Sequence, residues 1–141
     1  MHELDTCLEI VRDIKEKDED ILTIQYRTMS PKNQVLTGMP IGGGGGKSTA
    51  MDNYLIRVEK LNKAKERLQR QLDCEWNNVV GIFADHGITD AEMIALMKYR
   101  FYYGYPWKKC STKMQEGYKS GRWNINKCFR TYRYILHKTE R

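Results

Sequence analysis

Two long stretches of helical periodicity constrain the fold of this chain more than any other feature. Between residues 3 and 29, apolar side chains recur at steps of three and four, and charged residues fill the other faces. The same spacing returns between residues 51 and 83. A helix of about 30 residues would be about 45 Å long, too long to lie across so small a domain. We therefore expect the two helices to pair antiparallel as a hairpin, which is also a candidate surface for a homodimer.

The segment between these helices, residues 30–50, is polar and rich in glycine. It contains Gly46, Lys47 and Ser48, which resemble the last three residues of a nucleotide-binding P-loop. However, Ile41 stands where that motif needs a glycine, no strand precedes the loop, and no Walker B pattern follows. We therefore expect a flexible loop between two helices and no nucleotide cofactor.

After residue 87 the long helical periodicity is replaced by shorter segments. Thr89 and Glu92 have the capping-box spacing, which predicts the start of a helix that Gly104 and Pro106 end. A short helix over 107–114, a glycine-containing loop and a last helix from about Arg122 to His137 follow.

The last helix has one apolar and one basic polar face. Its predicted core stripe is Ile125, Cys128, Phe129, Tyr132, Ile135 and Leu136. No segment alternates as a strand does, so the predicted fold class is all-α. We expect a helical hairpin over 1–87, with its loop at 30–50, and a helix-turn-helix domain over 88–141.

The net charge of +6 is distributed unevenly. Residues 1–97 hold 12 basic and 16 acidic side chains, whereas residues 98–141 hold 12 basic and 2 acidic ones. A positive field of this size over a short segment attracts polyanions, and nucleic acid is the commonest intracellular one. A solvated basic surface is the alternative interpretation.

A short helix, a loop and a longer amphipathic helix are typical of the helix-turn-helix motif, whose second helix enters the major groove. On that helix Asn126 is a candidate for an adenine contact, and Arg122, Lys127 and Arg130 for contacts with guanine or phosphate. Trp123 either staples the helix to the preceding one or contacts a thymine methyl group or a sugar. The candidate phosphate-binding residues are Lys108, Lys109, Lys113, Lys119 and Arg133.

The sequence shows no pattern typical of a metal site, an enzyme active site or a membrane span. The four cysteines, Cys7, Cys74, Cys110 and Cys128, form no C-x-x-C pair and no zinc spacing, so we expect free, mostly buried thiols and no metal. The three histidines are far apart, and no nucleophile lies in a recognisable elbow, so an enzyme is not expected. No apolar stretch is long enough to cross a bilayer, and the first residues are acidic, so we expect a cytoplasmic protein.

Several short motifs together resemble a known family. They are Leu36 to Pro40 with the glycine-rich tail, the helix YLIRVEKLNKAKERLQRQL, Ile94 to Arg100, Gly104 with Trp107, and Gly117-Tyr118 before Trp123. Such motifs are similar to those of small phage and prophage proteins of Gram-positive bacteria, which join a helical hairpin to a helix-turn-helix like region 4 of sigma factors. Late-transcription activators of the ArpU and RinA type are their better-known relatives.

The resemblance implies a DNA-binding regulator of phage genes in a bacterial host cell, with RNA polymerase as a further candidate partner. The sequence departs from the family where two or three extra residues lie between Met114 and Trp123, and where Ser111 replaces a common alanine. The sequence thus predicts a sequence-specific regulator that binds double-stranded DNA. A phage DNA-packaging protein similar to a small terminase subunit, or a helical adaptor without enzymatic activity, remains an alternative.

Overall fold

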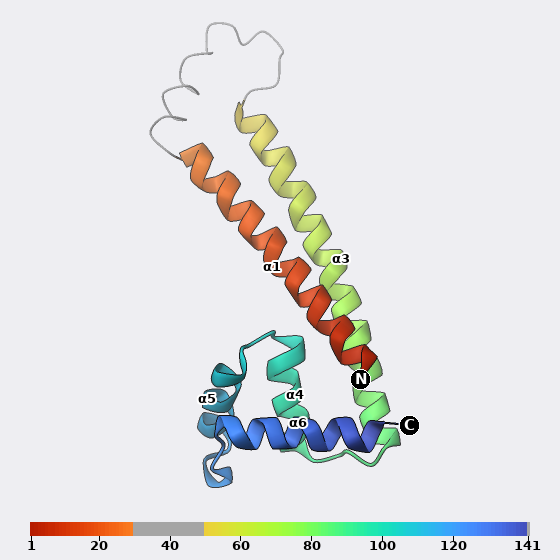
Figure 1. The fold of residues 1–141 in the computed structure, drawn as a ribbon. Helices are drawn as coiled ribbons and strands as arrows, with labels where there is room; N and C mark the ends of the chain where they lie inside the picture. Colours follow the sequence, from red (N-terminus) through yellow and green to blue (C-terminus); the bar gives the residue numbers. More distant parts are fainter. Residues whose placement is uncertain (30–49, 141) are drawn as a thin grey trace, which may run out of the picture. The chain divides into compact units, whose positions relative to one another are not determined.

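The computed structural model describes residues 1–29 and 50–140, and within these ranges the chain is helical with no strand (Figure 1). In chain order the elements are α1 (His2–Met29), α3 (Ala50–Asp85), α4 (Ala91–Met97), the π-helix η2 (Lys98–Tyr102), α5 (Trp107–Gly117), the 3-10 helix η3 (Lys119–Gly121) and α6 (Ile125–Thr139). The all-α prediction is confirmed. The P-loop-like stretch and the Gly38-Met39-Pro40 motif lie outside the described residues.

The chain divides into two compact units. One is Asp13–Gln69, and the other combines Met1–Arg12 with Arg70–Arg141, so α1 and α3 contribute to both. Each unit is a set of residues that make most of their contacts with one another. The partition into domains at residues 1–87 and 88–141 stays a prediction.

The Asp13–Gln69 unit is a helical hairpin. Asp18 of α1 forms an ion pair with Lys65 of α3, and further along α1 Ile24 shares a groove with Leu61. Residue numbers therefore rise along α1 as they fall along α3, which makes the two helices antiparallel. The predicted hairpin of two long helices is confirmed.

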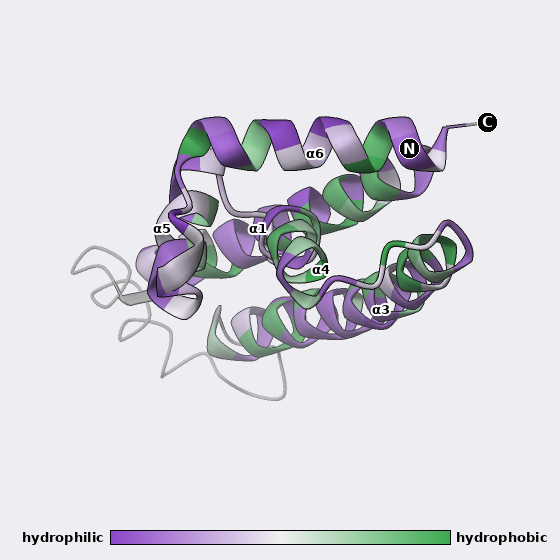
Figure 2. Ribbon diagram, turned by 90° about the horizontal axis from the view of Figure 1, so that it is seen from below, coloured by the Kyte–Doolittle hydropathy of each residue, from purple (hydrophilic) through white to green (hydrophobic). Residues whose placement is uncertain are grey.

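The other unit has one apolar core to which all its α-helices contribute. Phe101 lies at its centre, with ring centroids 6.4 Å from Trp107 and 5.6 Å from Tyr132. Figure 2 shows hydrophobic and hydrophilic residues alternating along α6, as an amphipathic helix requires. The buried apolar side chains are Leu4, Cys7, Ile10, Val11, Leu72, Trp76, Val79, Phe83, Ile88, Leu96, Met97, Phe101, Cys110, Met114, Trp123, Cys128 and Ile135.

Two local predictions about helix ends are wrong. Asp90 rather than Thr89 caps α4, because its carboxylate accepts hydrogen bonds from the backbone N–H groups of Glu92 and Met93 at 2.8 and 3.3 Å. α4 continues directly into η2, whose C-cap is Tyr103, so this helical segment ends at Gly104 as expected. The last helix begins at Ile125, about one turn later than Arg122, because Arg122 has a left-handed backbone and Asn124 is the N-cap.

All four cysteines are free, and three of them are buried, as predicted. Burial raises the pKa of the Cys7 thiol to about 11, with a smaller contribution from the carboxylate of Glu75. Burial also raises the pKa of Cys110 to about 11, partly offset by the Arg100 guanidinium, and raises that of Cys128. Because the thiolate is the reactive form, these three cysteines are protected from thiol reagents both by burial and by staying protonated.

Native protein should therefore react rapidly with one equivalent of a thiol reagent at pH 8, at the exposed Cys74. The other three thiols should react only after unfolding in denaturant. Counting modified cysteines by mass spectrometry over time checks this. Fast modification of Cys110 or Cys128 in the native protein would contradict the packing of α5 against α6.

Candidate nucleic-acid interface

The interface candidate is centred on α6, and its start is fixed by a side-chain cap. The Asn124 side chain accepts a hydrogen bond from the backbone N–H of Lys127 at 2.8 Å. Cys128 and Ile135 are buried on one side of the helix. The opposite side must therefore face solvent.

That solvent-facing side carries three of the predicted residues. Asn126, Arg130 and Arg133 are all exposed and follow one another at steps of four and three, so they form a single stripe. Neither arginine forms an ion pair with any residue in the described part of the chain. The stripe offers an amide and two unpaired guanidinium groups to a partner.

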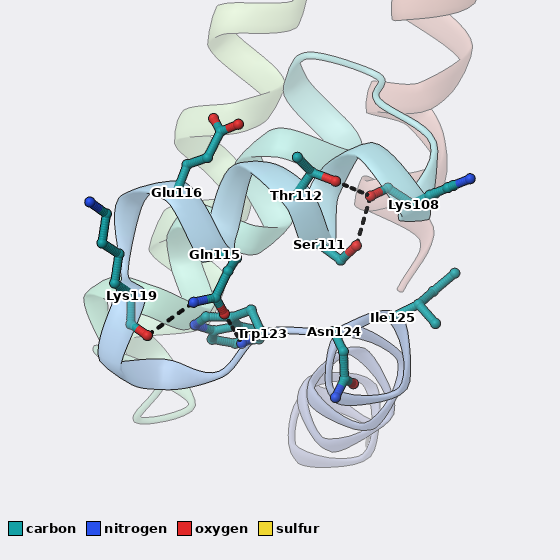
Figure 3. Close-up of a pocket in the computed structure, with 9 residues that line it drawn as sticks. All are labelled: Lys108, Ser111, Thr112, Gln115, Glu116, Lys119, Trp123, Asn124 and Ile125. Carbon is teal, nitrogen blue, oxygen red and sulfur yellow. Dashed lines mark hydrogen bonds between the residues drawn. The ribbon is translucent and has the colours of Figure 1, made fainter.

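The turn between α5 and α6 is closed by one amide side chain (Figure 3). Gln115 Nε2 donates to the carbonyl oxygen of Lys119 at 3.0 Å, and Gln115 Oε1 accepts from the backbone N–H of Trp123 at 2.7 Å. Both polar atoms of the side chain are thus used. The residues between Lys119 and Trp123 are thus closed into a turn by these two hydrogen bonds.

Trp123 is part of this turn and is largely buried. Its side chain is only 6% exposed, and a Cβ atom on Gly121 would lie 2.6 Å from its Nε1. The Lys127 ammonium lies 4.2 Å from the Trp123 ring centroid and donates to the carbonyl oxygen of Gly121. Of the two interpretations of Trp123, packing between the helices is the one that its burial favours. Lys127 is likewise turned back onto the turn, away from the Asn126 stripe.

Arg122 lies in the turn before α6 and has a left-handed backbone, with φ 48°. The prediction that it belongs to the face of the last helix is wrong, because that helix starts three residues later. Its side chain is exposed and forms no ion pair within the described residues. A residue with a Cβ atom is disfavoured in this conformation, whereas glycine is not.

Replacing Arg122 with glycine should therefore raise the free energy of unfolding by about 0.5 to 1 kcal/mol relative to Arg122→Ala. Both variants remove the same charge, and only glycine relieves the backbone. Urea unfolding followed by circular dichroism measures the difference. Equal stability of the two variants would show that the left-handed turn is not formed.

A groove lies between α5 and the start of α6 (Figure 3). Lys108 and Lys119, two of the candidate phosphate-binding residues, line it. Trp123, another predicted contact residue, also lines it. The sequence predicted no contact role for the six remaining lining residues: Ser111, Thr112, Gln115, Glu116, Asn124 and Ile125. Ile125 was assigned to the core stripe but is 39% exposed, because no earlier turn of α6 covers the first helical position.

Of two further predicted lysines, Lys109 lies apart from this groove and Lys113 is already paired with an acidic side chain. The Lys109 ammonium lies 4.1 Å from the ring centroid of Tyr105. Lys113 is 4.0 Å from the Glu116 carboxylate, on the same helix. The ten predicted contact residues are thus divided among the α6 stripe, the groove, the turn, the surface around Tyr105 and, for Lys113, an ion pair on α5.

No protein-family model, curated protein or solved structure matches this chain. None of the helices in the described ranges is both long and apolar enough to span a membrane. Within those ranges there is also no cluster of three or more potential metal ligands.

Proposed function

We propose that this protein is a sequence-specific transcriptional regulator that binds double-stranded DNA. The observation that carries the proposal is the α6 stripe of Asn126, Arg130 and Arg133, exposed and without acidic partners in the described residues. An asparagine amide matches adenine and an arginine guanidinium matches guanine in the major groove. The orientation of α6, which carries these residues, is fixed by the burial of Cys128 and Ile135 on its other side.

The groove supplies the positioning contacts in this proposal. Lys108 and Lys119 stand on its two borders beside the N-terminal end of α6, where the helix dipole also favours negative charge. Phosphate contacts of this kind orient a protein on a duplex and carry no sequence information. Arg122 is an exposed cation in the turn before α6, and Glu116 is the one acidic residue among those that line the groove.

The phage or prophage context rests on the sequence resemblance alone. On the same basis RNA polymerase is a candidate second partner, and the long hairpin is a candidate dimer surface. A dimer would place two α6 helices on two half-sites, which predicts a palindromic operator.

The decisive experiment is selection of binding sites from random duplex DNA, followed by sequencing. We expect one enriched motif, with matches upstream of late genes in phage genomes. The salt dependence of binding to that motif should have a slope of about −0.9 for each phosphate neutralised.

Two outcomes would overturn the proposal in different directions. A ring of eight or more subunits by native mass measurement would indicate DNA packaging. Absence of duplex binding even at low salt would indicate a helical adaptor.

A further inference from the structure

Four tyrosines gather where η2 ends and the chain turns towards α5. The backbone N–H of Tyr103 donates to the carbonyl of Lys98 at 3.0 Å, the five-residue step of a π-helix. Gly104 then takes φ 73°, which lets the N–H of Tyr105 return to the carbonyl of Tyr99 at 3.0 Å. The turn thereby brings three tyrosine rings together. We call Tyr99, Tyr103 and Tyr105 the tyrosine platform.

The rings of the platform are close to parallel. The ring centroids of Tyr99 and Tyr105 are 6.0 Å apart with planes at 14°, and those of Tyr103 and Tyr105 are 5.7 Å apart at 20°. Tyr99 and Tyr103 are 6.0 Å apart at 34°. At these separations near-parallel rings are offset and do not cover one another fully. They therefore present a stepped aromatic surface.

Positive charge borders this surface. The Lys109 ammonium lies 4.1 Å from the Tyr105 centroid, and that of Lys98 lies 5.9 Å from the Tyr103 centroid. Neither lysine forms an ion pair with a residue that the structure describes. Tyr103 is 45% exposed, so one ring of the platform remains open to a ligand.

Aromatic rings beside unpaired cations match the chemistry of unpaired nucleotides. Each base offers a flat face for stacking on a ring, and each phosphate offers a charge for a lysine. An acidic peptide would use the lysines but would have no flat group for the rings. The platform residues do not line the groove between α5 and α6, so this surface is additional to the one proposed for duplex DNA.

We propose that the tyrosine platform binds single-stranded nucleic acid, with a base stacked on Tyr103 and phosphates neutralised by Lys98 and Lys109. Binding then depends on the bases as well as on charge. This function goes beyond duplex recognition by α6 and does not require it.

The full-length protein should bind a fluorescent oligothymidylate of about 15 nucleotides at low salt, and bind an abasic oligonucleotide of equal length more weakly. Tyr103→Ala should weaken oligothymidylate binding by about 5- to 150-fold, the range expected for loss of one stacked base. Tyr103→Phe keeps the ring and should bind as the wild type does. Fluorescence anisotropy measures all four affinities.

Tyr134→Ala is the matched control, because Tyr134 is 47% exposed on α6 and has a single lysine, Lys138, 5.5 Å from its ring centroid. This variant should bind oligothymidylate normally. Arg130→Ala should weaken duplex binding and leave oligothymidylate binding unchanged, so the two proposals fail separately.

Three results would overturn the single-strand proposal. They are equal affinity for the abasic and thymidine oligonucleotides, no effect of Tyr103→Ala, and competition by polyglutamate as effective as that by oligothymidylate. Circular dichroism spectra that match the wild type exclude misfolding of the variants.

Discussion

Replacing Trp123 with alanine should lower the free energy of unfolding by about 3 to 5 kcal/mol, the usual cost of removing a buried tryptophan side chain. Trp123 is 6% exposed and lies against Gly121 and the Lys127 ammonium. Its loss leaves a cavity between the turn and α6 that glycine and lysine cannot fill. Urea unfolding at constant pH gives the change from the midpoint and slope.

The same experiment separates the two interpretations of Trp123. Trp123→Phe retains much of the apolar volume and should cost less than Trp123→Ala, whereas Tyr134→Ala removes an exposed ring and should change stability by about 0.5 kcal/mol or less. A stable Trp123→Ala protein with weakened DNA binding would instead make Trp123 a DNA contact. Its burial argues against that result.

Replacing Arg130 with alanine should weaken binding to the selected duplex by about 1 to 3 kcal/mol and relax specificity at one base pair. Arg130 is exposed on the same stripe as Asn126, and no residue in the described ranges forms an ion pair with it. Asn126→Ala should have an effect of similar size at a neighbouring position. Electrophoretic mobility shift at matched salt, with the selected site and single-base variants, measures both quantities.

Arg67→Ala is the charge-matched control, because Arg67 is exposed on α3 in the hairpin unit. It should leave specificity unchanged. Lys119→Ala should weaken binding to all sequences alike and reduce the salt slope by about 0.9. If Arg130→Ala and Asn126→Ala both bind the site as the wild type does, α6 is not the reading helix.

The long helices could be predicted because their signal is local and repeated many times. The periodicity between residues 51 and 83 predicted a helix that the structure places at Ala50–Asp85. The apolar stripe of the last helix likewise identified Cys128 and Ile135 as core. Each of these predictions follows from apolar side chains needing to share one face.

The turn could not be predicted from the same patterns. Arg122 takes a left-handed conformation that its side chain does not favour, and Trp123 is buried because Gly121 allows its ring to approach. The conformation of Arg122 and the burial of Trp123 depend on contacts between α5 and α6, and such contacts produce no periodic pattern in the sequence. Because the helix starts three residues later than expected, Ile125 is its first residue and stays 39% exposed. Lys127 folds back onto the turn, where it contacts Trp123 and Gly121.

The two hydrogen bonds of Gln115 bear on the entropy of binding. Because one amide joins the carbonyl of Lys119 to the N–H of Trp123, the residues that lead into α6 are ordered before any partner arrives. Ordering a loop during association reduces affinity, so a turn that is ordered during folding leaves more of the contact energy for the complex. The surface that α6 offers to a ligand would therefore be preorganised, because the entropy cost of ordering the turn is incurred during folding and not during binding.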